Sequence, residues 1–214
     1  MDAEGWVLAG GRSLRMGRDK AEVALAGRPL LEHMLDKLRM LGLRARVAGL
    51  RAPVANVAAE VWSDAHPDCG PLSGMETALQ KSEAALALMV GVDLPLLERE
   101  FLFWILQRAA TTGAMATIPR LAGEPQPLCA VYRRELLGGV TEALHSGDYK
   151  VMVAVERASA GRIDGGGVDC FDVERVWAAD AWRSTRPAHW QFMNCNTPED
   201  LTLAAASLAG APML

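Results

Sequence analysis

The chain has 214 residues, half of them hydrophobic, and a formal net charge of −4 at pH 7. This length and apolar share suit one large α/β domain, so we expect residues 1–214 to form a single domain. A mildly acidic chain offers no general basic surface, and we expect no nucleic-acid partner. The four cysteines form no C-x-x-C pair, which argues against a zinc site or a thioredoxin-like redox motif. Without a signal sequence or an apolar stretch of about 20 residues, we expect a cytoplasmic protein with no membrane attachment.

An apolar run at residues 6–9 opens into a loop rich in glycine and cations that extends to Lys20. The run is typical of a strand buried on both faces of a parallel sheet. Because Gly10 and Gly11 lack Cβ atoms, their backbone N–H groups can approach an anion closely. The loop carries a local excess of cations: Arg12, Arg15, Arg18 and Lys20. Its spacing fits neither G-x-G-x-x-G nor the Walker loop, but its charge predicts a site for a negatively charged phosphate chain.

The next two patterns along the chain predict a first β-α-β unit. Residues 30–41 carry an apolar stripe at helical spacing, which Pro29 can start and Gly42 can stop. Residues 45–50 then resemble a second strand. A right-handed crossover between parallel strands places the first loop at the carboxyl edge of the sheet, where open α/β sheets bind ligands.

Another fully apolar run, residues 85–92, leads directly into Asp93. A strand of this character is buried, and its tip presents the carboxylate at the same edge as the first loop. A carboxylate in that position can hold Mg²⁺ between protein and phosphate oxygens. The alternative is that Asp93, with Pro95 two residues on, only opens a turn.

Other elements are expected from periodicity and turn chemistry. They are turns over residues 61–74, helices over 75–84, 98–110 and 136–145, a strand over 114–118, and a short element over 150–157. Residues 161–189 show no clean period. Thr197 and Pro198 suit the cap and first turn of a final helix, whose positive end Glu199 and Asp200 complement.

Four stretches resemble one family, in that family's order. Residues 8–20, L-A-G-G-R-S-L-R-M-G-R-D-K, are similar to the signature of nucleotidyltransferases with a molybdenum cofactor guanylyltransferase-like fold, approximately L-A-G-G-x-S-x-R-M-G-x-D-K. The later stretches are G-P-L-S-G at residues 70–74, D-L-P at 93–95 and N-C-N-T-P-E-D-L at 194–201. The resemblance implies a three-layer α/β fold, a mostly parallel sheet flanked by helices, of the Rossmann-like, GT-A-like nucleotidyltransferase class.

The same resemblance implies a reaction. The phosphate of molybdopterin or molybdenum cofactor would attack the α-phosphorus of GTP, so that GMP is transferred and pyrophosphate is released. The N-terminal half would bind GTP and the C-terminal half the pterin acceptor, with Mg²⁺ as cofactor and cofactor-delivering proteins as potential partners. No protein nucleophile is needed, because bringing three anionic groups together and offsetting their charge is the main task.

The resemblance also implies roles for individual residues. Those expected to be catalytic are Arg15, Lys20 and Asp93, with Asp93 holding the metal ion. Those expected to bind the nucleotide are Leu8, Ala9, Gly10, Gly11, Lys20, Leu50, Asp64 and Asp93. Asp68 is the second choice for the role of Asp64, and the alternative is that both acids only cap the turn.

The acceptor site is expected around Asn194 and Asn196, which helix capping does not explain. In an extended segment, residues two apart face the same side, so both amides can enter one pocket. Amides suit a pterin edge or phosphate, and Lys150 or Arg133 can add a cation. The alternative is that the asparagines only tie the loop to the last helix. Residues 123–133 also resemble the acceptor side of the family, with an edge strand carrying prolines as the alternative.

Leu50 departs from the family pattern, which usually has an asparagine near the nucleotide. Leucine cannot hydrogen-bond a base, so cytidylyl transfer to the same pterin and a sugar-phosphate nucleotidyltransferase stay open as alternatives. G-P-L at residues 70–72 favours the guanylyl branch by resemblance. A non-catalytic nucleotide-binding adaptor is a further hypothesis, but the presence of both Lys20 and Asp93 favours an enzyme.

Overall fold

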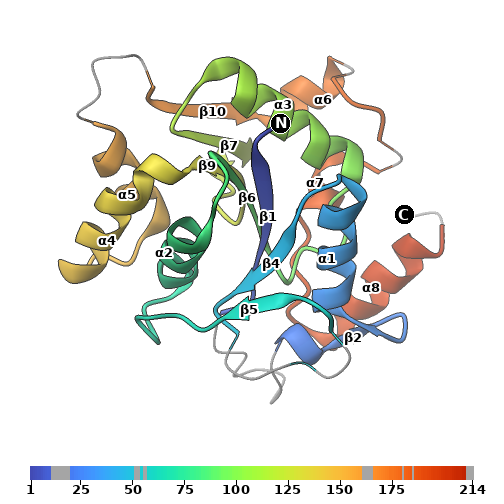
Figure 1. Cartoon of the computed structure of the whole chain (residues 1–214). Coiled ribbons are helices and arrows are strands. Elements are labelled where there is room, and N and C mark those ends of the chain that lie inside the picture. Colours follow the sequence, from blue (N-terminus) through green and yellow to red (C-terminus); the bar gives the residue numbers. More distant parts are fainter. Residues whose placement is uncertain are drawn as a thin grey trace.

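A computed structural model describes residues 1–10, 20–50, 54, 57–160, 166–179, 181–184 and 186–210. A mixed, mostly parallel sheet lies between two layers of helices (Figure 1), which confirms the expected three-layer α/β fold. Its strands, in sheet order, are β10 (Val168–Asp172), β7 (Ala116–Leu121), β9 (Cys129–Arg133), β6 (Leu86–Gly91), β1 (Ala3–Leu8), β4 (Ala45–Ala48) and β5 (Glu60–Trp62). β8 (Glu124–Pro125) pairs with β7, while β2 (Ala24–Leu25) and β3 (Arg28–Pro29) form a separate hairpin.

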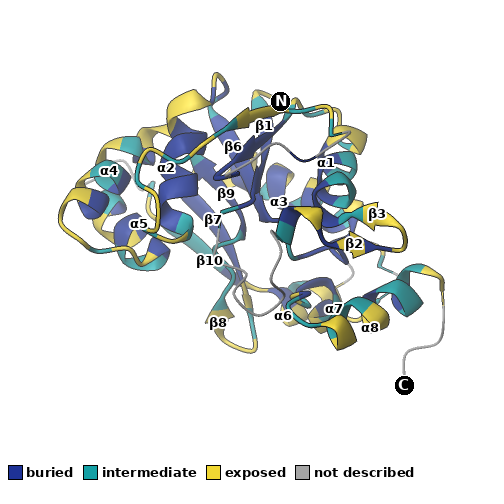
Figure 2. Ribbon diagram, turned by 90° about the horizontal axis from the view of Figure 1, so that it is seen from below, coloured by how far each residue is buried: buried dark blue, intermediate teal, exposed yellow. Residues whose placement is uncertain are grey.

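The helices cover both faces of the sheet, and each face has its own hydrophobic core. One face carries α1 (Leu30–Met40), α3 (Arg99–Thr112), α6 (Val173–Ala178), α7 (Ala188–Gln191) and α8 (Pro198–Leu208). The other carries α2 (Pro71–Lys81), α4 (Leu137–His145) and α5 (Val151–Ser159). Short 3-10 helices are η1 (Lys20–Glu22) and η2 (Arg134–Leu136). Side chains alternate between the two cores along each strand, and Figure 2 shows the buried strands enclosed between the layers.

Four adjacent strands, β6, β1, β4 and β5, are parallel to one another. β9 pairs antiparallel with both β6 and β7, and β10 pairs parallel with β7. The parallel pairing of β1 with β4 through α1 confirms the first β-α-β unit. Among the described residues, no helix has the length and apolar character needed to cross a membrane.

Several expectations about single elements need correction. The helix expected over residues 75–84 is α2, which starts earlier because Pro71 suits a first helical turn. The edge-strand alternative for residues 123–133 holds for β8, which contains Pro125 and pairs with β7 alone, but not for β9, which lies inside the sheet. Pro125 and Pro127 both precede β9, so it keeps every backbone N–H that pairing on both sides requires.

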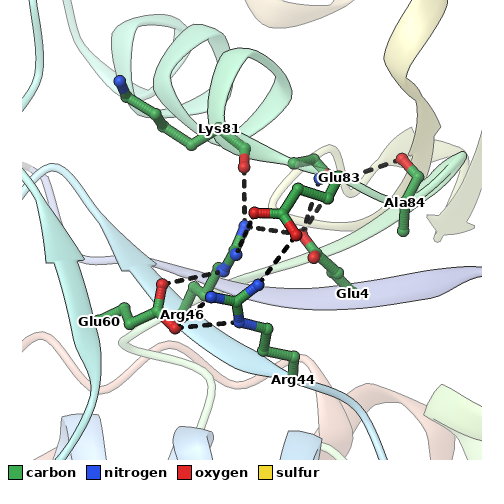
Figure 3. A network of polar contacts seen from close by, with 8 residues as sticks. Glu4, Arg44, Arg46, Glu60, Lys81, Glu83 and Ala84 are labelled. Atoms are coloured by element: carbon green, nitrogen blue, oxygen red, sulfur yellow. Dashed lines mark hydrogen bonds and ion pairs between the residues drawn. The ribbon is translucent and has the colours of Figure 1, made fainter.

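A buried ionic network closes the amino end of β1 and β4 (Figure 3). Arg46 is 1% exposed, and its guanidinium lies 3.1 Å from a carboxylate oxygen of Glu4 and 3.2 Å from one of Glu83. The same guanidinium lies over the rings of Trp6 and Trp62, at 5.4 and 5.3 Å from their centroids. Because this network lies at the amino edge, it supports the sheet without entering the site at the carboxyl edge.

Candidate active site

The carboxyl ends of four neighbouring strands bring distant parts of the chain together. Asp93 follows β6, Gly10 follows β1, Gly49 follows β4 and Asp64 follows β5. The chain passes from β1 to β4 and β5 on one side, then returns to β6 on the other side of β1. The boundary between β1 and β6 is therefore the topological switch point, where α/β sheets of this kind bind ligands.

Lys20 connects the first loop to this point. Its Nζ donates to Asp93 Oδ2 at 2.8 Å and to Asn196 Oδ1 at 2.5 Å. The side chains of Lys20 and Asp93 are 24% and 14% exposed, so their ion pair is shielded but reachable from solvent. The structure thus joins the loop cation, the strand-tip acid and one of the two predicted asparagines.

Asp93 is held by its backbone as well. Its carbonyl oxygen accepts a hydrogen bond from the backbone N–H of Cys195 at 2.9 Å, which fixes the segment before α8 against the end of β6. A Cβ atom on Gly91 would lie only 2.8 Å from Asp93 Oδ1. Glycine at position 91 therefore leaves room for the carboxylate, a requirement that the apolar pattern of this strand did not show.

Asp64 lies against the backbone of two glycines. A Cβ atom on Gly10 would be 3.2 Å from Asp64 Oδ2, and one on Gly49 would be 3.0 Å from the same oxygen. Thr77, on α2, donates to Asp64 Oδ1 at 3.4 Å. This position beside the start of the first loop favours Asp64 over Asp68, which is exposed on a turn with a φ of 67°.

Three of the residues expected to bind nucleotide have side chains in the core, so a contact with the nucleotide would have to come from their backbone. The side chains of Leu8, Ala9 and Leu50 are buried, Leu50 with only 2% exposed. The carbonyl of Leu8 and the N–H of Ala9 bond to neighbouring strands, and the carbonyl of Leu50 accepts from Ser63 Oγ at 3.4 Å. Because the side chain of Leu50 is buried, position 50 would contribute only backbone groups to recognition of a base. Gly11 and Arg15 lie outside the described residues.

The predicted acceptor residues are only partly brought together. Asn196 is half-buried and faces Lys20, whereas Asn194 is exposed. Arg133 is paired in register with Leu86, at the amino end of β6, and its Nε donates to the carbonyl of Ala114 at 3.0 Å. Asp93 follows the other end of that strand, so the prediction that Arg133 adds a cation beside Asn196 is wrong.

Lys150 is likewise not joined to the asparagines. It lies at the N-cap position of α5, without a side-chain capping bond. The first residue of α5 packs in the core on the α2 face, whereas Cys195 packs in the core on the α8 face. Among the described residues, no hydrogen bond or ion pair connects Lys150 with Asn194 or Asn196. The cation that contacts Asn196 is Lys20, which the sequence analysis assigned to nucleotide binding rather than to the acceptor site.

Cys195, between the two asparagines, has a packing role. It is fully buried, and burial together with the nearby carboxylates raises the pKa of its thiol to about 12. A thiol with that pKa is neutral near pH 7 and behaves as a small apolar side chain. It anchors the segment that carries Asn196.

The donor set suits Mg²⁺ shared with a phosphate ligand. Asp93 Oδ2 and Asn196 Oδ1 converge on one cation, the ammonium of Lys20, and both are hard oxygen donors. Within the described ranges, no group of three or more His, Cys, Asp or Glu side chains could form a metal cage by itself. Mg²⁺ commonly uses one or two protein oxygens and completes its shell with water and substrate phosphates, so these residues fit it.

Comparison with known proteins agrees with this geometry. Residues 5–160 match the MobA-like NTP transferase domain. The chain belongs to this family. The match begins in β1 and ends after α5, so it contains the loop lysine and the strand-tip acid.

Individual relatives extend the similarity to nearly the whole chain. A molybdenum cofactor guanylyltransferase from Xanthomonas euvesicatoria is 32% identical over 91% of this chain and 90% of its own length. The crystal structure of molybdopterin-guanine dinucleotide biosynthesis protein A from Archaeoglobus fulgidus aligns with a TM-score of 0.77 and 26% identity, covering 97% of this chain and 99% of that one. A 2-C-methyl-D-erythritol 4-phosphate cytidylyltransferase from Thermus thermophilus shares the fold, with a TM-score of 0.65 at 16% identity over 95% and 98% of the two chains.

Proposed function

We propose that this protein transfers GMP from GTP to the phosphate of molybdopterin or molybdenum cofactor and releases pyrophosphate. The observation that carries the proposal is the contact of the Lys20 ammonium with Asp93 and Asn196 at the β1/β6 switch point. A nucleotidyltransferase needs a cation and an oxygen donor at the place where a triphosphate enters, and this site has both. The names of the Xanthomonas and Archaeoglobus relatives support guanine and a molybdopterin acceptor.

Each residue then has a task in the transfer. Asp93, with Asn196 beside it, would hold Mg²⁺, and the metal would supply charge neutralisation for the phosphate oxygens when it is bound. Lys20 would donate to a phosphate oxygen, because its ammonium has three N–H donors and two are used within the protein. Gly10 would contribute backbone at the start of the loop, where a side chain would crowd Asp64.

Base and acceptor recognition are assigned to different sides of this centre. Guanine would be read near Asp64 and Gly49, by polar groups other than the core-packed side chain of Leu50. The pterin would enter beside the segment of Asn194 and Asn196, whose exposed member offers amide donors and an acceptor. The two substrates would therefore meet where Lys20 and Asp93 face each other.

The direct test is pyrophosphate release with molybdopterin and Mg²⁺, comparing GTP with CTP, ATP and UTP. GTP should be the best substrate, since hydrogen bonds from a site to the correct base discriminate strongly. Preference for CTP would move the protein to the cytidylyl branch, and absence of release with every nucleotide would refute the proposal. Repeating the assay with chelator tests the need for Mg²⁺ separately.

A further inference from the structure

The ammonium of Lys20 has two partners of different kinds. Asp93 Oδ2 is an anion at 2.8 Å, and Asn196 Oδ1 is a neutral amide oxygen at 2.5 Å. The amide cannot neutralise the lysine, so its contribution is directional: it fixes one N–H and thereby the orientation of the other two. Asn196 therefore orients the ammonium without offsetting its charge, which among the two contacts only Asp93 does.

Asn196 is itself fixed by the start of α8. Its backbone N–H donates to Asp200 Oδ2 at 2.9 Å, and the N–H of Thr197 donates to the same oxygen at 2.8 Å. Thr197 Oγ1 in turn accepts from the N–H of Asp200 at 3.2 Å, which completes a capping box. The capping box consists of the two bonds between Thr197 and Asp200, so the bond from Asn196 is additional and ties that residue to the helix.

The helix is anchored to the rest of the molecule. Arg186 Nε donates to Ser207 Oγ, near the end of α8, at 2.8 Å. Its guanidinium also lies 3.2 Å from Glu98 Oε1, next to the start of α3. The position of Asn196 is therefore set by elements packed on the sheet.

We propose that Asn196 is a positioning residue for Lys20, and that Asp200 positions Asn196 by accepting a hydrogen bond from the backbone N–H of Asn196. The inference rests on the proposed function and assigns a step within it. The ion pair of Lys20 with Asp93 is present together with the amide contact, so the amide does not decide whether that pair forms; it adds a second described partner, which fixes the direction of the remaining N–H. Asn196 thereby aims the third N–H of the ammonium at the place where a phosphate oxygen of the triphosphate would bind.

The test uses three variants of the full chain. Asn196→Ala removes the amide, and Asp200→Asn removes the carboxylate charge while keeping its shape. Glu199→Gln is the matched control, because it removes a charge from the same helical turn at an exposed residue outside the capping box. For each variant, the Kd of GTP is measured with and without Mg²⁺, together with kcat, the KM of each substrate and the melting temperature.

We expect Asn196→Ala to weaken binding of GTP in Mg²⁺ about tenfold, since hydrogen bonds to charged groups have that order of effect, and to leave the KM of molybdopterin unchanged. The Kd of GTP should rise by a similar factor without Mg²⁺, because Lys20 would contact the phosphate directly, whereas loss of a metal ligand would raise the Kd only in the presence of Mg²⁺ and a purely structural role would leave both values unchanged. Asp200→Asn should shift binding in the same direction by a smaller factor, and Glu199→Gln should bind GTP like the wild type.

Three outcomes overturn the inference. A rise in the KM of molybdopterin with unchanged GTP binding would make Asn196 an acceptor residue only. A lower melting temperature with both affinities unchanged would make it a structural tie. Normal Mg²⁺-dependent binding of GTP by the Asp200→Asn variant would show that the start of α8 does not position Asn196. If the wild type itself neither binds GTP nor releases pyrophosphate, the proposed function fails, and that result is recognised without any variant.

Discussion

Gly49→Ala tests whether the junction between β1 and β4 shapes the nucleotide site. Gly49 has a φ of +83°, in the left-handed region, and a Cβ atom there would lie 2.8 Å from the backbone nitrogen of Gly10 and 3.0 Å from Asp64 Oδ2. A non-glycine residue in this conformation costs about 1–2 kcal/mol. The contact with backbone adds an overpacking cost of about 1–3 kcal/mol, because Gly10 cannot rotate away as a flexible side chain would.

Gly42→Ala is the matched control. Gly42 ends α1 with a φ of +74°, but an added Cβ atom would meet nothing within 4 Å. This variant should therefore lose only the conformational part, about 1–2 kcal/mol of unfolding free energy. Because its position is remote from the strand tips, GTP binding should be unchanged.

The two variants are compared by urea unfolding and by GTP titration in Mg²⁺. Gly49→Ala should lose more stability than Gly42→Ala and should also bind GTP more weakly, since any relief of the contact moves Gly10 or Asp64. Equal losses of stability, or unchanged GTP affinity in Gly49→Ala, would refute the idea that these two glycines and Asp64 form one wall of the site.

Three further predictions concern other parts of the molecule. Lys20→Ala should lower kcat/KM by about a hundredfold or more, as removal of one charge-stabilising donor does, while urea unfolding stays close to wild type; near-normal pyrophosphate release would contradict its role. Arg46→Ala should cost about 3–5 kcal/mol in urea unfolding, because Glu4 would remain buried without its cation; a loss below about 1 kcal/mol would show that the pair is solvated. Cys69 and Cys170 are partly exposed and should react with a thiol reagent in the folded protein, whereas Cys129 and Cys195 should react only on unfolding; rapid labelling of all four would contradict the burial.

The sequence predicted best those elements whose signal is local. The end of β1, residues 6–8, and the whole of β6 are apolar because both faces of a parallel strand are covered, and α1 has a stripe because only one face packs. From the order of strand, glycine-rich loop and strand-tip acid, Lys20 and Asp93 could be placed at one edge, and the structure joins them at 2.8 Å.

Elements that depend on tertiary packing were not predicted. β5 has three residues, and β10, α6 and α7 are short, so none gives a measurable period. The region from β10 onwards is held by aromatic contacts with α3, including Phe101 with Trp182 and Trp104 with Phe171, each with ring centroids 5.0 Å apart. Such contacts leave tryptophans at irregular spacing in the sequence, which is the pattern seen over residues 161–189.

Asn196 shows that a tie to the last helix and a contact with Lys20 are not alternatives, because the structure has both. The two-residue repeat of an extended chain predicted that both asparagines face one pocket, yet Asn196 is half-buried against Lys20 and Asn194 is exposed. The same carboxylate, Asp200 Oδ2, accepts from the N–H of Thr197 to cap α8 and from the N–H of Asn196. Since one oxygen makes both bonds, any change that loosens the start of α8 also moves the amide that orients Lys20. The cap is thus part of how the site is built, and its loss should be visible in GTP affinity as well as in stability.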